Sequence, residues 1–310
     1  MIADNVVVIE KVEKKFGDTY ALKGVSHVVK REEIHVLLGP NGSGKSTLLK
    51  ILAGILKPDK GRAVVLGKEP YLNPEVKKFI GYCPQENLLY ESLTGFENLV
   101  FYAGLYGLSP SQAKERAREL SEILGLDEWF FRKKVKAYSG GMAKRASLAV
   151  SLVHDPQVLI MDEPTSGLDP QARRLLWDAV DKLRNEGKTV ILATHIFEDA
   201  EVLADKVVVM HKGRVVAVGG AGDLKRKIGC RYALELEFSR EPEKDVLAKL
   251  KKIAGESRLL KVGNTIRLLV DDASLISKIE EASPGKLLNL SVRRISLGDV
   301  YFALTGVELK

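Results

Sequence analysis

Hydrophobic and polar residues along the first 220 positions follow two alternating periods, that of a strand and that of a helix. Short, mainly apolar runs at 34–38, 158–161 and 188–193 predict buried strands. A longer helical insert, at about 86–153, contains a strongly amphipathic stretch at 109–124. Strands that alternate with helices in this way are typical of an α/β sheet.

The N-terminal residues show the two-residue period of β-strands. Positions 6–13 alternate between apolar and polar residues and predict an edge strand, and positions 21–29 predict a second strand. The turn between them carries the aromatic side chains of Phe16 and Tyr20. We expect both rings to lie near the glycine-rich stretch that follows.

The pattern changes after the glycine-rich segment 219–222, which we interpret as a hinge. The predicted elements then follow the order β-α-β-β-α-β, with strands at 231–239, 259–262, 265–270 and 287–294. That order predicts a small α+β domain of the ferredoxin-like type. We therefore divide the chain into an α/β domain at 1–220 and an accessory or regulatory domain at 221–310.

A glycine-rich turn between a predicted strand and a predicted helix forms a P-loop, the pattern G-x-x-x-x-G-K-[ST]. Its glycines let the backbone approach a phosphate closely, and the helix start directs free N–H groups at the anion. Lys45 adds a full charge near the β- and γ-phosphates, the Ser46 hydroxyl should bind Mg²⁺, and Thr47 should bind the α-phosphate. The residues expected to contact ATP here are Gly39, Pro40, Asn41, Gly42, Ser43, Gly44, Lys45, Ser46 and Thr47.

Two carboxylates end the buried strand near residue 160. Mg²⁺ beside phosphates needs a carboxylate, and Asp162 has the position for it. Glu163 lies one residue further on, where a carboxylate can orient and deprotonate the attacking water. Downstream of a P-loop, this pair predicts hydrolysis of the γ-phosphate.

Two further polar residues follow predicted strands. The amide of Gln85 could bind Mg²⁺ and respond to the nucleotide, although most glutamines are surface residues. The ring of His195 could donate to the γ-phosphate in company with Glu163, and a purely structural histidine is the alternative. We place Glu163, His195, Gln85 and Lys45 in the catalytic set, and Ser46, Gln85 and Asp162 in the metal set.

An aromatic ring is expected against the adenine. We favour Phe16 and keep Tyr20 as the second choice. The alternative for either ring is that it caps the small N-terminal sheet.

A second anion site is predicted by Ser139, Gly140 and Gly141, which supply a hydroxyl and two N–H groups at a helix start. One chain already has a phosphate cradle in its P-loop. A partner chain packed head to tail explains the second one, because each ATP then lies between a P-loop and the facing helix start.

Several short motifs occur in order along residues 5–220. They are the P-loop at 39–47, a Q-loop at Gln85, a signature at Tyr138-Ser139-Gly140-Gly141-Met142, the strand end at Asp162-Glu163, a D-loop at Ser166-Gly167-Leu168-Asp169 and a switch histidine at His195. With these motifs the chain resembles the nucleotide-binding subunit of ABC transporters. Its C-terminal region looks like the extension on ATPase subunits of drug- and polysaccharide-type exporters.

The resemblance implies a P-loop ATPase fold with a mixed core sheet, an antiparallel edge sheet and a helical subdomain. It also adds Asp169 to the residues expected at ATP. The family usually has leucine where Tyr138 stands, but the serine and both glycines of the signature are present. The family's aromatic loop position corresponds to Phe16, a phenylalanine in place of the commoner tyrosine.

The implied function is that of an ATP-hydrolysing subunit that forms a homodimer and powers a separate transmembrane subunit, as an exporter. Contact with that subunit is expected through residues 85–97 and the helical insert. One alternative is a soluble ABC-type ATPase that acts on nucleic acid or ribosomes, although such proteins usually carry two cassettes or a long coiled-coil insert. Another is a nucleotide-sensing regulator with negligible turnover.

Composition and charge narrow these alternatives. The net charge of +7 is a mild excess, which does not by itself indicate nucleic-acid binding, so no nucleic-acid partner is expected. The 2 cysteines have no metal-binding spacing and predict reduced thiols in the cytosol. No apolar run approaches the roughly 18 residues that a membrane helix needs. The resemblance to an ABC transporter subunit implies a cytoplasmic protein that is peripheral on the inner face of the cell membrane.

Overall fold

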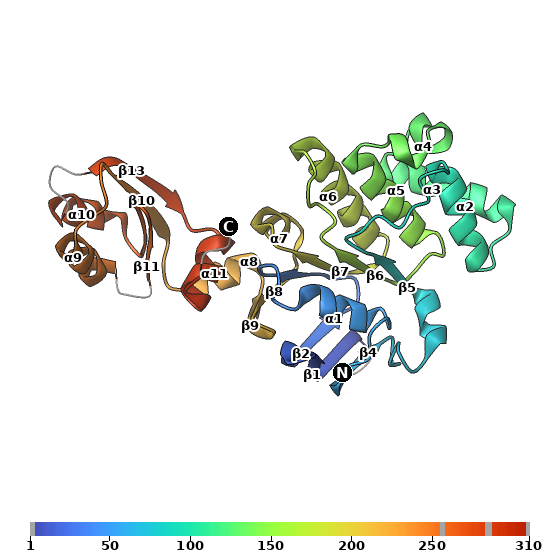
Figure 1. Ribbon diagram of the computed structural model, residues 1–310, viewed down its shortest axis with the longest axis horizontal. Helices are drawn as coiled ribbons and strands as arrows, with labels where there is room; N and C mark the ends of the chain where they lie inside the picture. The colour runs from blue at the N-terminus through green and yellow to red at the C-terminus, as the bar shows by residue number, and fades with distance from the viewer. Residues whose placement is uncertain (1–3, 255–257, 283–286, 308–310) are drawn as a thin grey trace. The chain divides into compact units, whose positions relative to one another are not determined.

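The computed structural model describes residues 4–254, 258–282 and 287–307 (Figure 1). Contacts divide the chain into two compact units, Met1–Val218 and Gly219–Lys310. Each unit has its own sheets, and we describe each by itself. Within the described residues, no helix is both long enough and apolar enough to cross a bilayer.

A 6-stranded sheet forms the centre of the first unit. Its parallel strands β3, β6 and β7 are buried at every residue, which explains their continuous apolar runs. The strand order is β5 (Ile80–Cys83), β6 (Val158–Asp162), β7 (Thr189–Thr194), β3 (Ile34–Leu38), β8 (Lys206–His211) and β9 (Arg214–Gly219). Because β3, β6 and β7 are parallel neighbours, the residues that follow them meet at one edge of the sheet.

Helices α1 (Lys45–Leu52), α6 (Pro170–Asn185) and α7 (Phe197–Leu203) accompany this sheet. Leucines of α1 share one apolar core with valines and isoleucines of both the large sheet and a smaller one. Helix α1 therefore lies between two sheets, and this packing holds the loop before it in place. A short 3₁₀ segment, Pro74–Phe79, leads into β5.

The smaller sheet is 3-stranded, in the order β2-β1-β4. Its strands are β1 (Asn5–Phe16), β2 (Thr19–Lys30) and β4 (Lys60–Val65). The prediction of an edge strand at 6–13 is wrong, because Val7 pairs with Val29 on one side and with Val65 on the other. Alternation of polar and apolar residues reports which face of a strand is buried and carries no information about how many neighbours the strand has.

The helical insert lies between β5 and β6 and gathers on one side of the unit, in green in Figure 1. Thr94 and Ser109 start its first two helices with complete capping boxes. Phe130 is fully buried among them. The insert consists of α2 (Gly95–Leu105), α3 (Pro110–Leu124), α4 (Glu128–Arg132), a 3₁₀ turn at Val135–Ala137 and α5 (Gly140–Leu152).

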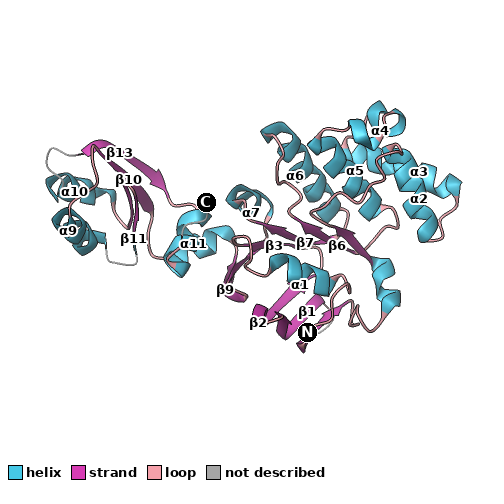
Figure 2. Cartoon of the chain, in the orientation of Figure 1, coloured by secondary structure: helices cyan, strands magenta, loops and turns pink. Residues whose placement is uncertain are grey.

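The second unit contains a 4-stranded antiparallel sheet in the order β11-β12-β10-β13. This order, with a helix after β10 and another after β12, confirms the predicted ferredoxin-like arrangement. Figure 2 shows α9 and α10 together on one side of this sheet. The elements are α8 (Ala221–Lys227), β10 (Tyr232–Phe238), α9 (Lys244–Ala254), β11 (Leu259–Val262), β12 (Thr265–Val270), a 3₁₀ turn (Ala273–Leu275), α10 (Ile276–Ala282), β13 (Leu287–Arg294) and α11 (Leu297–Thr305).

Candidate active site

The glycine-rich loop between β3 and α1 has a backbone that only glycine adopts comfortably. Gly42 and Gly44 have φ angles of 78° and 103°, in the left-handed region. A Cβ atom on Gly39 would lie 2.3 Å from the carbonyl oxygen of Met210, and one on Gly44 would lie 2.5 Å from that of Ala21. The backbone of Met210 and that of Ala21 thus pack closely against the two ends of the loop, and the N–H groups of the loop lie at the start of α1.

Lys45 is a buried cation, with only 5% of its surface exposed. Its ammonium donates to the carbonyl oxygen of Gly39 at 2.7 Å and to that of Pro40 at 3.2 Å. The Oε1 atom of Glu163 lies 3.4 Å away. Burial lowers the pKa of Lys45, and the charge of Glu163 opposes that change. A buried ammonium beside a loop of N–H groups is suited to an anionic ligand.

Ser43 supports the same conclusion. Its hydroxyl is buried and has no hydrogen-bond partner among the described residues. Buried hydroxyls in folded proteins are nearly always hydrogen-bonded, so an unpaired one in a phosphate loop suits a bound acceptor. The loop residues therefore fit the triphosphate of ATP.

Ser46 and Asp162 meet across the sheet edge. The Ser46 hydroxyl donates to Oδ1 of Asp162 at 3.0 Å. Burial raises the pKa of Asp162, and the neighbouring Glu163 raises it further. The described residues contain no group of three metal-binding side chains, and Mg²⁺ at nucleotide sites takes its other oxygens from phosphates and water. One hydroxyl and one carboxylate fit that mode of Mg²⁺ binding.

Glu163 follows β6 and has a φ angle of 49°, which is strained for a residue with a side chain. Its N–H donates to the carbonyl oxygen of Ala193 on β7 at 2.8 Å. One carboxylate oxygen faces Lys45, and the other lies 2.8 Å from Nδ1 of His195. The strained backbone and these two contacts hold the carboxylate in one orientation between a cation and an imidazole.

Asp199 is a buried residue that sequence analysis did not identify. Its carboxylate accepts hydrogen bonds from Thr165, from Thr194 at 2.7 Å and from the indole of Trp177 at 2.9 Å. Thr165 lies two residues after Glu163, and Thr194 immediately precedes His195. Asp199 therefore joins the two backbone segments that carry Glu163 and His195. The sequence feature that could have identified Asp199 is its position as a carboxylate in the first turn of the helix that follows β7.

Gln85 reaches the phosphate loop. It lines a pocket of about 240 Å³ together with Glu163 and residues of the P-loop. Its backbone carbonyl accepts a hydrogen bond from Lys144 at 2.6 Å, which connects the segment after β5 to α5. The members of this pocket are Asn41, Gly42, Gly44, Lys45, Ser46, Thr47, Gln85 and Glu163.

The predicted contacts with adenine and with the second anion site, Gly140 and Gly141 included, lie elsewhere in the unit. Phe16 and Tyr20 flank the tip of the β1–β2 hairpin and are 50% and 45% exposed. Ser139 is exposed at the start of α5, where its hydroxyl accepts from the N–H of Met142 at 3.3 Å. Asp169 is exposed and caps α6, accepting from Ala172 at 2.9 Å. None of these side chains lines the phosphate pocket of its own chain.

Tyr138, in the family's usual leucine position, connects two parts of the helical insert. Its hydroxyl accepts a hydrogen bond from the N–H of Gly95 at 2.8 Å, at the start of α2. Its ring packs edge to face on Trp129, with 5.0 Å between ring centroids. Tyrosine here thus supplies an acceptor for a helix-start N–H group that leucine lacks.

Comparison with known proteins gives four similarities. A family model described as ABC transporter matches residues 22–166. The linearmycin resistance ATP-binding protein of Bacillus subtilis is 35% identical, over 97% of this chain and 98% of that protein. The Nod factor export ATP-binding protein of Burkholderia orbicola is 37% identical, over 96% of each. A solved dimeric structure of a bacterial ABC transporter cassette matches with a TM-score of 0.64 at 28% identity, over 69% of this chain and 98% of that one.

Proposed function

This chain belongs to the ATP-binding subunits of ABC transporters, and on that premise we propose how its residues bind and hydrolyse ATP. The family couples hydrolysis of ATP to transport, with Mg²⁺ as the metal. The observation that carries the residue assignment is the pair of contacts made by Glu163, to Lys45 at 3.4 Å and to His195 at 2.8 Å. These contacts leave a carboxylate aimed into the pocket that the P-loop lines.

In the proposed reaction, Glu163 accepts a proton from water, and the water oxygen bonds to the γ-phosphorus. The bond from that phosphorus to the bridging oxygen breaks, so ADP leaves with the electron pair and phosphate is released. Lys45 offsets the negative charge on the phosphate oxygens, and His195 donates a hydrogen bond to the γ-phosphate. With a proton on each ring nitrogen, the imidazole donates from Nδ1 to Glu163 and from Nε2 to the γ-phosphate.

Ser46, Asp162 and Gln85 are the residues that we assign to Mg²⁺, which when bound neutralises charge on the β- and γ-phosphates. The serine and aspartate already lie 3.0 Å apart. Gln85 shares the phosphate pocket with Ser46.

The second half of each ATP site comes, in this proposal, from another copy of the chain. Ser139, Gly140, Gly141 and Asp169 are the residues donated. Two observations support this: Ser139 and Asp169 are exposed, and neither lines the phosphate pocket of its own chain. A dimeric cassette structure of similar fold is also known. Phe16 is the residue proposed to stack on the adenine, with Tyr20 as the alternative.

A separate membrane subunit is proposed to dock on an apolar groove of about 240 Å³ beside the helical insert. Leu88 and Leu89 line it, three and four residues after Gln85. The buried side-chain amide of Asn98 holds the loop at Tyr90, one residue after Leu89. It accepts a hydrogen bond from the N–H of Tyr90 at 2.7 Å and donates one to the carbonyl oxygen of Tyr90 at 3.1 Å. One short segment thus connects the phosphate pocket to the groove, which gives nucleotide state a route to the partner.

The direction and place of transport are also proposals. The two relatives named above are described as a resistance protein and an export protein, and both align along nearly the whole chain. We accordingly propose an exporter ATPase bound peripherally to the cytoplasmic face of the membrane. Residues 1–220 would be its catalytic domain and residues 221–310 an accessory domain.

The variant Glu163→Gln tests the assignment. It keeps the shape of the side chain and removes the proton acceptor, so we expect ATP turnover to fall about 100-fold or more. ATP binding should persist, and with ATP and Mg²⁺ the variant should accumulate as a dimer in light scattering. Glu186→Gln, on the loop after α6, is the matched control. Equal turnover in Glu163→Gln and the parent protein would remove Glu163 from the reaction.

A further inference from the structure

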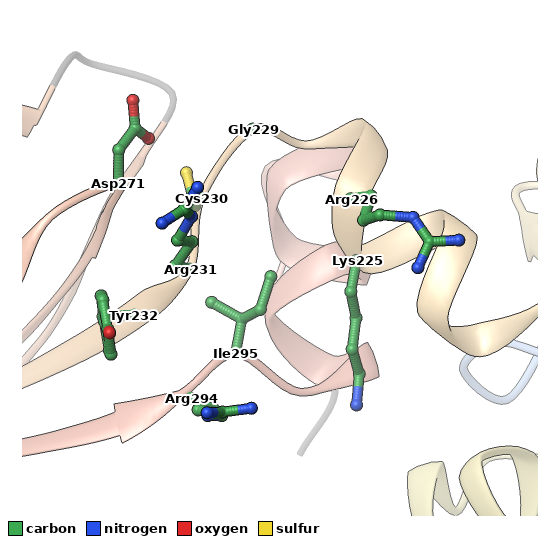
Figure 3. A pocket seen from close by; sticks show the side chains of 9 residues that line it. All are labelled: Lys225, Arg226, Gly229, Cys230, Arg231, Tyr232, Asp271, Arg294 and Ile295. Atoms are coloured by element: carbon green, nitrogen blue, oxygen red, sulfur yellow. The ribbon is translucent and has the colours of Figure 1, made fainter.

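Strand β13 forms an edge of the sheet in the second unit that is open to further pairing. In the order β11-β12-β10-β13 it is the last strand, and within the described residues no strand lies on its outer side. Its backbone N–H and C=O groups on that side therefore have no strand to bond with. Its last residue, Arg294, borders a cavity of about 890 Å³ (Figure 3), and the residues before it make up the rest of the edge.

The two edges of this sheet differ in how well they are protected against pairing. Proteins protect an edge with a short strand, charged side chains, proline or a bulge. Strand β11 is 4 residues long, Leu259–Val262, and carries Lys261. Strand β13 is 8 residues long, and positions 287–292 contain neither a charge nor a proline. Its pairing with β10 has one register shift, between Glu237 and Phe238 of β10, and is regular beyond it. A long, uncharged edge of this kind favours the addition of another strand.

The side chains of β13 are of two kinds, one on each face of the sheet. Leu290 and Val292 pair with Leu236 and Leu234 of β10 and share the face that forms the apolar core of the unit. Val292 is nevertheless 42% exposed at the open edge. Because side chains alternate along a strand, three polar residues lie on the opposite face: Asn289, Ser291 and Arg293.

We propose that β13 pairs with β13 of a second copy of this chain, antiparallel about a two-fold axis at Ser291. The two 4-stranded sheets then form one continuous sheet. In this register Leu290 faces Val292 of the partner subunit, and Asn289 faces Arg293 of the partner subunit. Apolar residues oppose apolar ones and polar residues oppose polar ones, so the strand is complementary to itself. A one-residue shift would place Leu290 opposite Ser291 and mismatch both faces.

This contact needs no nucleotide, so it is separate from the ATP-dependent dimer proposed above. Main-chain hydrogen bonds between the two strands supply affinity, and the alternate side chains supply the register. A two-fold contact of this kind closes at two copies. It keeps two copies together between rounds of ATP hydrolysis and raises the effective concentration of one catalytic unit beside the other.

Charge on the two-fold axis tests the pairing, because the exposed Ser291 then faces its own copy. Sedimentation equilibrium measures dimer formation by the full chain without nucleotide or Mg²⁺, and the parent protein should dimerise. Ser291→Glu and Ser291→Lys each place two like charges opposite one another, so each should weaken the dimer about 5-fold or more. An equimolar mixture of the two variants sets opposite charges face to face and should dimerise at least as well as the parent.

The matched controls are Val262→Glu and Val262→Lys on β11, the other edge strand, where the side chain is 52% exposed. Both should dimerise as the parent does. The proposal is overturned by a parent protein that stays monomeric at about 100 μM. Equal losses in the Ser291 and Val262 variants, or a mixture that dimerises no better than its two components, would also overturn it. Because nucleotide is absent throughout, each of these results leaves the proposed ATPase mechanism untouched.

Discussion

Asp199 accepts a hydrogen bond from the Thr194 hydroxyl at 2.7 Å, which ties helix α7 to the residue that precedes His195. The same carboxylate accepts from the Trp177 indole at 2.9 Å. Among the described residues, the Asp199 side chain forms no hydrogen bond with Glu163 or His195. It is a positioning residue, and its role is to keep two loops in register.

We expect Asp199→Asn to lower kcat about 10-fold or more while KM for ATP changes little. The new amide has one acceptor oxygen where the carboxylate has two, so either the Trp177 indole or the two threonine hydroxyls lose their acceptor. With Trp177→Phe the amide oxygen can face the threonines, so the double variant should recover much of the lost kcat. Steady-state kinetics of the single and double variants measure this. A KM change without a kcat change would contradict the positioning role.

Ser46→Ala is expected to raise the Mg²⁺ concentration needed for half-maximal turnover by about 10-fold. The Ser46 hydroxyl lies 3.0 Å from Asp162, so its loss removes one of the three protein groups proposed for the metal. Thr47→Val is the matched control, because that hydroxyl is assigned to the α-phosphate. It should change KM for ATP and leave the Mg²⁺ dependence alone. Identical Mg²⁺ curves for Ser46→Ala and the parent would refute the assignment.

The half-buried His27 and the buried His35 form a hydrogen-bonded pair that responds to pH. Nε2 of His27 lies 2.7 Å from Nδ1 of His35, and Nε2 of His35 lies 2.7 Å from Glu33. Burial, together with His35, lowers the pKa of His27 from 6.5 to about 4, and burial also lowers the pKa of His35. Both rings are therefore held in the neutral form in the folded protein.

Below its ordinary pKa of 6.5, His27 binds a proton in the unfolded chain but not in the native one until about pH 4. The contribution of His27 to stability is thus complete above pH 6.5 and is lost as pH falls toward 4. The free energy of unfolding should drop by about 1.4 kcal/mol per pH unit for this one group. Urea unfolding of the parent and of His27→Gln measures the difference, and the variant should show the shallower slope. Parallel pH profiles would exclude His27 as the cause.

Tyr138→Phe removes the hydroxyl that accepts from the N–H of Gly95 at 2.8 Å. The free energy of unfolding should fall by about 1 kcal/mol, because an N–H group at the start of α2 loses its partner. Tyr71→Phe, where the ring is 44% exposed, is the control and should change stability far less. Denaturant unfolding of both variants tests this. A Tyr138→Phe protein as stable as the parent would mean that water replaces the hydroxyl.

Several parts of this protein could be predicted from the sequence because they are encoded within short segments. The P-loop, the carboxylates at 162–163 and the histidine after β7 each follow a strand whose apolar run is visible in the sequence. Parallel strands place their following residues at one edge of the sheet, so these groups were expected to meet. The hairpin at Gly263-Asn264 is likewise local, because the turn residues specify it.

Other parts depend on residues far apart in the chain, and only the tertiary structure reveals them. The two-sided pairing of β1, the partners of Asp199 and the contact between His27 and His35 have no pattern of spacing in the sequence. A cavity in the second unit likewise takes its lining from segments as far apart in the chain as Lys225 and Ile295. Periodicity specifies which face of a helix or strand is buried. Which elements pack against that face is set by the packing of the whole chain, because the folded structure must leave few voids and few buried polar groups without a hydrogen-bond partner.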